Sequence, residues 1–216
     1  MVLATVGLGL LVGVTVHEFS HALVAYRLGD TTAKRLGRLS LNPLRHLDPM
    51  GTVMLVLVGF GWGKPVPVNP VAFRNGRLGM AAVSAAGPLS NVAAAFLFAI
   101  PINVGLLTSQ TSPFPGIFGG GVEGLAAYLT GVVIFFNILL AVFNLLPLFP
   151  LDGSKVVLGL LPGGLARRFA RLEAYGPVLL LLLILLDSFS GVGVLRRVIG
   201  PVVNYLGRLI VGEGFF

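Results

Sequence analysis

The stretch "TVHEFSHALVAY" (residues 15–26) places two histidines and a glutamate inside a segment that otherwise has the composition of a membrane-spanning helix. The first 26 residues contain no lysine or arginine. Ionisable side chains are unfavourable inside a membrane, and those that occur there usually serve a function. The stretch therefore indicates both a membrane-spanning helix and a functional site within it.

The composition around this stretch indicates a membrane protein. Of the 216 residues, 56% are hydrophobic and only 11% are charged, whereas soluble domains carry about a quarter charged residues. A spanning helix needs about 20 mostly apolar residues, and the sequence predicts such helices at 2–26, 78–107, 122–146 and about 174–192. The tail from residue 193 either lies flat as an amphipathic interfacial helix or spans weakly. We therefore expect an all-α polytopic membrane protein, a bundle of about four to five transmembrane helices.

The connection between the first two predicted helices is unusual. The stretch "GTVMLVLVGFGWG" (51–63) is too short to span and is expected to be re-entrant or interfacial. The next stretch, "KPVPVNPVAF" (64–73), carries three prolines and is expected to be extended. Irregular backbone at membrane depth needs protein or water to cover it, which predicts a water-filled cavity. We expect residues 1–216 to form one domain, with a core at about 2–162 and C-terminal helices at about 174–210.

The net charge of +7 comes from residues between the apolar segments. This distribution argues against nucleic acid as a partner, because phosphate binding needs a basic face. Lysines and arginines occur in residues 30–77 and 163–173, while 108–121 contain neither. By the positive-inside rule we expect a multi-pass protein of the cell membrane with its N-terminus outside and the active site toward the cytoplasmic side.

His17 and His21 are four residues apart, so on a helix they share one face with Cβ atoms roughly 5–6 Å apart. Two imidazoles so placed can bind one Zn²⁺ at about 2.0–2.1 Å per nitrogen. Glu18 is angled to reach a water on the metal rather than the metal itself, which is the His-Glu-x-x-His arrangement of zinc hydrolases. The alternative is a polar helix face that lines a pore or pairs inside the bundle.

Catalytic zinc usually takes three protein ligands and leaves a fourth position for water. The chain has no cysteine, which excludes thiolate ligands. Asp152 is the favoured third ligand, because Pro147 and Pro150 break a helix at depth and leave the aspartate free to project. Its alternative role is the N-cap of a helix that starts near Gly153. His46 is an alternative ligand, although a surface-loop histidine is the simpler interpretation.

Three motifs together resemble the site-2 protease family of intramembrane zinc metalloproteases: "HEFSH" (17–21), "GPLSN" (87–91) and "NLLPLFPLDG" (144–153). The stretches "LNPLRHLDPMGT" (41–52) and "GWGKPVPVNP" (61–70) resemble the compact branch that lacks a PDZ domain. The resemblance covers about residues 13–160. It implies one zinc ion per chain, ligands at His17, His21 and Asp152, Glu18 as the catalytic base, and membrane-spanning segments of other proteins as substrates.

Further residues are predicted to act on the substrate. The resemblance implies a catalytic role for Asn91 near the scissile carbonyl, and an amide in a dry site can stabilise an oxyanion, although Asn91 could equally bridge helices. Asn144 is a weaker candidate for substrate contact and also suits a positioning role around Asp152. Val66 and Val68 lie in the extended stretch, whose backbone could pair with an unwound substrate by strand addition. The alternative role of that stretch is a rigid cap.

These observations favour an intramembrane zinc metalloprotease. We expect Glu18 to take a proton from the attacking water and to return it to the leaving amine. Substrate helices must unwind locally, because a helical peptide bond is shielded and internally hydrogen-bonded. The alternative function is a non-proteolytic metal-binding or metal-transport membrane protein. The sequence leaves the substrate and the oligomeric state open.

Overall fold

The structure is a computed structural model that describes residues 2–58, 61–109, 121–190 and 193–215. Three of the predicted spans are long helices: α1 (Val2–Arg27), α4 (Gly76–Asn103) and α5 (Gly121–Asn144). Each contains a stretch that is long and apolar enough to cross a membrane. The predicted external connection, 108–121, lies mostly outside the described residues. The expectation of an all-α polytopic membrane protein is confirmed.

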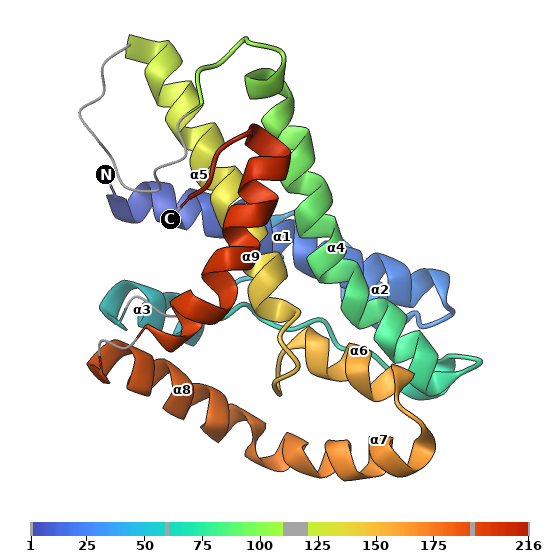
Figure 1. The fold of residues 1–216 in the computed structure, drawn as a ribbon. Helices are drawn as coiled ribbons and strands as arrows, with labels where there is room; N and C mark the ends of the chain where they lie inside the picture. Colours follow the sequence, from blue (N-terminus) through green and yellow to red (C-terminus); the bar gives the residue numbers. More distant parts are fainter. Residues whose placement is uncertain (1, 59–60, 110–120, 191–192, 216) are drawn as a thin grey trace.

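The fourth predicted span corresponds to α8 (Gly176–Ser190), which begins close to the predicted start at about 174. The basic connection 163–173 is helical as well, because alanine, leucine and arginine all favour helix: it forms α7 (Gly163–Ala170) and the 3-10 helix η3 (Arg171–Tyr175). By length and composition, the helical stretch Gly163–Asp187 is a candidate membrane span. Only 11% of its most apolar window is buried, and Figure 1 shows α7 and α8 along one end of the molecule.

The last helix, α9 (Val194–Val211), packs against α5 and α4 and lies beside α5 in Figure 1. It buries Ile199, Val203 and Ile210 in the main apolar core. The side-chain amide of Asn103 donates to the carbonyl of Ile210 at 2.9 Å. In the part of the chain that the structure describes, α9 is not among the helices with the length and composition of a span.

The centre of the bundle is α4, which packs against α1, α5 and the short helix α6 (Asp152–Leu160). In Figure 1, α4 and α5 run side by side and α1 crosses them. Small residues permit the close approach of α6, since a Cβ at Gly159 would lie 2.4 Å from that of Ala81. Arg77, at the start of α4, donates to the carbonyls of Leu158 and Leu161. These contacts hold the last turn of α6 against the first turns of α4.

The chain between α1 and α4 has little regular structure. It forms α2 (Thr32–Arg35), η1 (Pro43–Arg45), α3 (Pro49–Val58) and η2 (Pro70–Ala72). Helix α3 is too short to span, as expected, and the chain beyond it folds back, with the carbonyl of Trp62 against Gly51. Residues 59–60 of the predicted re-entrant stretch lie outside the described residues. Residues 64–69 contain no helix, and Asn69 has extended dihedral angles, in agreement with the extended prediction there. The prediction was wrong for residues 70–72, which form the 3-10 helix.

Candidate metal centre

The two histidines of the first helix face inward and are buried. Their rings lie at right angles to one another, with centroids 4.5 Å apart. The Nε2 atom of His17 lies 2.9 Å from Oδ2 of Asp152, and Nε2 of His21 lies 3.1 Å from the same oxygen. The i, i+4 spacing on α1 and the start of α6 thus bring all three predicted ligands together.

The approach of Asp152 depends on the turns after α5. A Cβ at Gly153 would lie 2.2 Å from the carbonyl oxygen of Leu145, so only glycine lets the chain double back this closely. Leu151 is the N-cap of α6, with no side-chain cap bond, and Asp152 is the first helical residue. The N-cap interpretation of Asp152 is therefore wrong. Its carboxylate turns to the histidines and not to its own helix.

Each histidine has an acceptor for its other ring nitrogen. Nδ1 of His17 donates to Oδ1 of Asn91 at 2.6 Å, and Nδ1 of His21 donates to the carbonyl of Val83 at 2.7 Å. When Nδ1 carries the proton, the lone pair of a neutral imidazole is on Nε2. Such outer hydrogen bonds commonly fix the orientation of metal-binding histidines. Both Nε2 atoms are therefore presented toward the position between the histidines and Asp152.

The donor set fits zinc. The three ligand atoms lie within 4.8 Å of one another, and in the described ranges no other group of three or more such residues could hold a metal ion. Two imidazoles and one carboxylate are a common catalytic zinc set. Ligand atoms about 2.0–2.2 Å from a tetrahedral metal lie about 3.3 Å apart, close to the 2.9 and 3.1 Å observed.

Gly87, in α4, keeps the space beside this centre open. A Cβ at this position would lie 2.5 Å from Nε2 of His21 and 2.6 Å from Nε2 of His17. The glycine is the first residue of the "GPLSN" motif, but no separate role for it was predicted from the sequence. Its importance comes from a tertiary contact between α4 and α1, and a missing side chain leaves no pattern that predicts such a contact.

Glu18 lies beside the ligands without belonging to the metal group. On an ideal helix it points about 100° from His17 and about 60° from His21. It is half-buried, and its Oε2 accepts a hydrogen bond from the amide of Val66 at 3.0 Å. The extended segment therefore reaches the predicted base directly.

Asn91 is completely buried in α4. Besides accepting from His17, it donates through Nδ2 to the carbonyl of Gly13 and to Oδ1 of Asn137, both at 2.9 Å. Both amide hydrogens thus have acceptors, and an oxyanion could use one only after that acceptor was released. The catalytic role of Asn91 stays a prediction. Asn137, in α5, was not singled out from the sequence.

The other residues predicted to contact the substrate, Asn144, Val66 and Val68, make few hydrogen bonds. Asn144 donates to the carbonyl of Leu140 within its own helix at 3.0 Å. The amide of Val66 is bonded to Glu18, while the backbone of Val68 has no hydrogen-bond partner among the described residues. The roles predicted for Asn144, Val66 and Val68 stay predictions.

His46 is not the surface-loop histidine that was predicted. Its side chain is fully buried, and its Nε2 donates to the carbonyl of Ser40 at 2.6 Å. Its own carbonyl accepts from the amide of Lys64 at 2.8 Å. The surface interpretation was wrong because this histidine joins the loop to the extended segment. His46 is not in the metal group.

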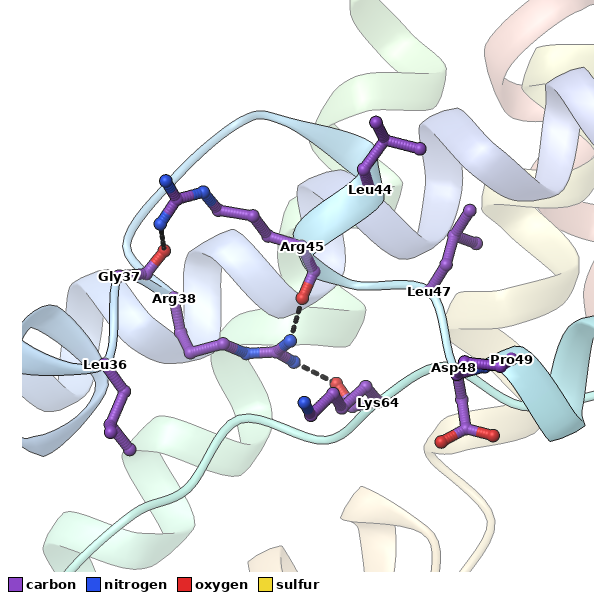
Figure 2. A pocket seen from close by; sticks show the side chains of 9 residues that line it. All are labelled: Leu36, Gly37, Arg38, Leu44, Arg45, Leu47, Asp48, Pro49 and Lys64. Atoms are coloured by element: carbon purple, nitrogen blue, oxygen red, sulfur yellow. Dashed lines mark hydrogen bonds between the residues drawn. The ribbon is translucent and has the colours of Figure 1, made fainter.

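Two charged residues fix the extended segment 64–69 (the strap hereafter). Arg38 donates to the carbonyls of Arg45 and Lys64, as Figure 2 shows, and to that of Pro65 at 3.3 Å.

The pocket in Figure 2 contains none of the proposed ligands. It is lined by Leu36, Gly37, Arg38, Leu44, Arg45, Leu47, Asp48, Pro49 and Lys64. It is therefore a feature of the loop around Arg38 and not the metal centre.

Asp30, just after α1, holds the other end of the strap. Its carboxylate accepts from the amide of Asn69 at 2.7 Å and from that of Thr32 at 2.9 Å. Burial by itself raises the pKa of Asp30, but the hydrogen bonds from Asn69 and Thr32 and the charge of Arg35 outweigh it and lower the pKa below its ordinary value. Asp30 therefore stays ionised at neutral pH and retains both acceptor oxygens.

The fold and the site define a multi-pass membrane protein with the ligand set of a zinc hydrolase. The chain is 44% identical over 180 residues, 81% of its length, to the Bacillus subtilis (strain 168) protein named "Putative zinc metalloprotease YwhC", of which it covers 77%. It is 32% identical over 189 residues to "Putative zinc metalloprotease Rip2" of Mycobacterium tuberculosis (strain H37Rv), with 85% of this chain and 67% of that protein covered. No protein-family model and no solved structure matches the chain.

These similarities identify the family. The chain belongs to the site-2 protease family of zinc metalloproteases. Membership supports a metalloprotease, and hence hydrolase, function with zinc as the cofactor, in agreement with the His17, His21 and Asp152 group.

Proposed function

We propose that the chain is an intramembrane zinc endopeptidase that hydrolyses peptide bonds within or near transmembrane segments of other membrane proteins. The observation that carries the proposal is the convergence of His17, His21 and Asp152 inside a bundle of apolar helices. Glu18 stands next to the two histidines on the same helix. The proposed catalytic unit is the single domain 1–216, with its core at about 2–162.

The chemistry is divided among a few side chains. A bound zinc ion supplies a Lewis acid for the peptide carbonyl and activates the attacking water. Glu18 receives the proton of that water and delivers it to the leaving amine, as a general base and then a general acid. The amide of Val66, 3.0 Å away, holds the carboxylate in place. Asn91 orients His17 through Nδ1, and its amide is the proposed oxyanion donor if one of its hydrogens becomes free.

The strap is the proposed substrate-binding edge. A substrate segment must be extended to be cleaved, and an extended peptide can add to an unpaired strand. The backbone of Val68 has no partner among the described residues, which supports this role, whereas the amide of Val66 already serves Glu18. Asn144, the last residue of α5, is the weaker proposed contact, just before the turns that lead to Asp152.

The orientation follows from charge. Residues 30–77 and 163–173 carry the lysines and arginines of the connections, so they are proposed to face the cytoplasm. The metal centre then lies toward the cytoplasmic side and the N-terminus outside. The partners proposed are membrane-protein substrates and the lipid bilayer, with no role for nucleic acid.

Reconstitution tests the proposal. Purified protein is mixed in liposomes with a single-span substrate, and the products are located by mass spectrometry. The wild type should cut within or near the apolar segment, and Glu18→Gln should not. Glu123→Gln removes an exposed carboxylate from the first turn of α5 and should cut normally. Equal cleavage by Glu18→Gln would remove Glu18 from the mechanism, and cuts confined to soluble regions would refute intramembrane proteolysis.

A further inference from the structure

Asn137 is a polar residue in the most apolar part of the bundle. It lies in α5, is completely buried, and has the fully buried Ile134 and Ile138 as neighbours along the helix. Burial of an amide is unfavourable unless it is hydrogen-bonded. Asn137 is bonded at both ends: Nδ2 donates to the carbonyl of Val133 at 2.8 Å, and Oδ1 accepts from Asn91 at 2.9 Å.

The direction of this chain of hydrogen bonds is fixed by backbone groups. The carbonyl of Val133 can only accept, so Nδ2 of Asn137 must face it and Oδ1 must face Asn91. Nδ2 of Asn91 then meets two oxygens, those of Asn137 and of the Gly13 carbonyl. A flipped Asn91 would place its own oxygen against both. Oδ1 of Asn91 is therefore held toward His17, 2.6 Å away.

The fixed orientation of Asn91 determines how His17 is hydrogen-bonded at the metal centre. Nδ1 of His17 meets only an acceptor, so it carries the proton and the lone pair lies on Nε2, which faces Asp152 at 2.9 Å. We propose that Asn137 is a positioning residue which, through Asn91, holds His17 in the ring orientation and the tautomer that bind the metal. This inference rests on the proposed metal centre, and it concerns metal affinity before any cleavage takes place.

His21 provides an internal comparison. Its Nδ1 donates to a backbone carbonyl, that of Val83, at 2.7 Å. A backbone carbonyl can only accept a hydrogen bond, and it cannot flip to present a donor instead. A side-chain amide such as Asn91 has an acceptor and a donor end and can flip, so it needs a second residue to select the acceptor end. Asn137 meets that need, which explains a buried amide between the apolar residues of α5.

Substitution of Asn137 tests the proposal through zinc affinity, measured by chelator competition on the purified full chain. Asn137→Ala removes the acceptor for Asn91, and we expect zinc to bind about 10–100-fold more weakly, the effect typical of losing the hydrogen bonds that orient a metal-binding histidine. Asn137→Asp keeps an oxygen for Asn91 in either protonation state, so affinity should stay within about threefold of wild type.

Ile138→Ala is the matched control. It opens a cavity at a fully buried position one residue along α5 but touches none of these hydrogen bonds, so zinc affinity should stay within about threefold of wild type. If Asn137→Ala does not accumulate as folded protein, Asn137→Leu fills the space with an apolar side chain and is expected to weaken zinc binding in the same way. Wild-type affinity in a folded Asn137 variant without an acceptor, or equal losses in Asn137→Ala and Ile138→Ala, would overturn the proposal.

The same samples separate this inference from the proposed function. If zinc affinity falls as expected while the wild type cleaves no membrane-embedded substrate, the positioning role stands and the protease proposal fails. If the wild type cleaves but zinc affinity does not depend on Asn137, the protease proposal stands and the positioning role fails.

Discussion

At the scale of single residues, the centre depends on side chains that the sequence could reveal and on one contact that it could not. His17, Glu18 and His21 were predictable because helix periodicity is local, and four residues always return to the same face. Asp152 was predictable from the prolines before it and from the family resemblance. Gly87 was not, because the requirement for a missing Cβ arises only when α4 meets α1.

Gly87→Ala is predicted to empty the metal centre. The added Cβ would lie 2.5 Å from Nε2 of His21 and 2.6 Å from Nε2 of His17, while alanine favours helix and should leave α4 itself intact. We expect zinc per chain, measured by metal analysis after purification, to fall well below the wild-type value. Gly7→Ala in α1, where a Cβ meets nothing within 4 Å, is the control and should keep its zinc. A wild-type zinc content in Gly87→Ala would show that metal binding does not require the missing Cβ at this position.

At the scale of elements, the strap shows what sequence can and cannot tell. Its prolines predicted an extended backbone, because proline lacks a donor and has a fixed φ. Its attachments were not predictable, since they pair Glu18 with Val66 and Asp30 with Asn69, residues far apart in the sequence. The interpretation of His46 failed for the same reason, because its partners lie in other turns of the loop.

Asp30→Asn is predicted to loosen the strap. Asparagine turns one acceptor oxygen into a donor, so the bonds from the amides of Asn69 and Thr32 cannot both persist. Hydrogen exchange of residues 64–69, measured by mass spectrometry at neutral pH, should become faster. Asp48→Asn is the control, because Asp48 accepts from Gly51 at the start of α3 and its loss should leave exchange in the strap unchanged. Unchanged exchange in Asp30→Asn would mean that the other attachments suffice.

The same carboxylate predicts a dependence on pH. The pKa of Asp30 is lower in the folded protein than its ordinary value of 3.8. Its contribution to stability is therefore fully present above the ordinary pKa and is lost as the pH falls through the lowered one. In melting experiments in detergent, the stability advantage of wild type over Asp30→Asn should be constant near neutral pH and should shrink below about pH 4. An advantage that grows on acidification would contradict the assignment.

At the scale of the whole molecule, hydropathy identified the spanning helices and charge suggested their direction. The basic connection 163–173 was expected only as a link between spans, and it is helical because a basic stretch can form helix as readily as an apolar one. The central position of α4, packed against α1, α5 and α6, was not predictable, since the small residues that allow it do not identify their partners.

Cysteine labelling tests the orientation in a chain that has no native cysteine. Thr108 and Gly164 are both exposed. Thr108 lies in the connection predicted to be external, and Gly164 lies in α7, within the basic stretch 163–173 that is proposed to face the cytoplasm. In intact cells an impermeant maleimide should label Thr108→Cys and should label Gly164→Cys only after permeabilisation. The reverse labelling pattern would show the opposite orientation in the membrane, with the metal centre toward the outside.

The central claim is that His17, His21 and Asp152 hold a zinc ion while Glu18 does not. The most direct measurement is zinc per chain in purified Asp152→Ala and Glu18→Gln, beside the wild type. A three-ligand site that loses one ligand should retain zinc poorly, so Asp152→Ala is predicted to contain far less zinc than the wild type. Glu18→Gln, like the wild type, is predicted to contain about one ion per chain. Full zinc in Asp152→Ala, or its loss in Glu18→Gln, would contradict the account.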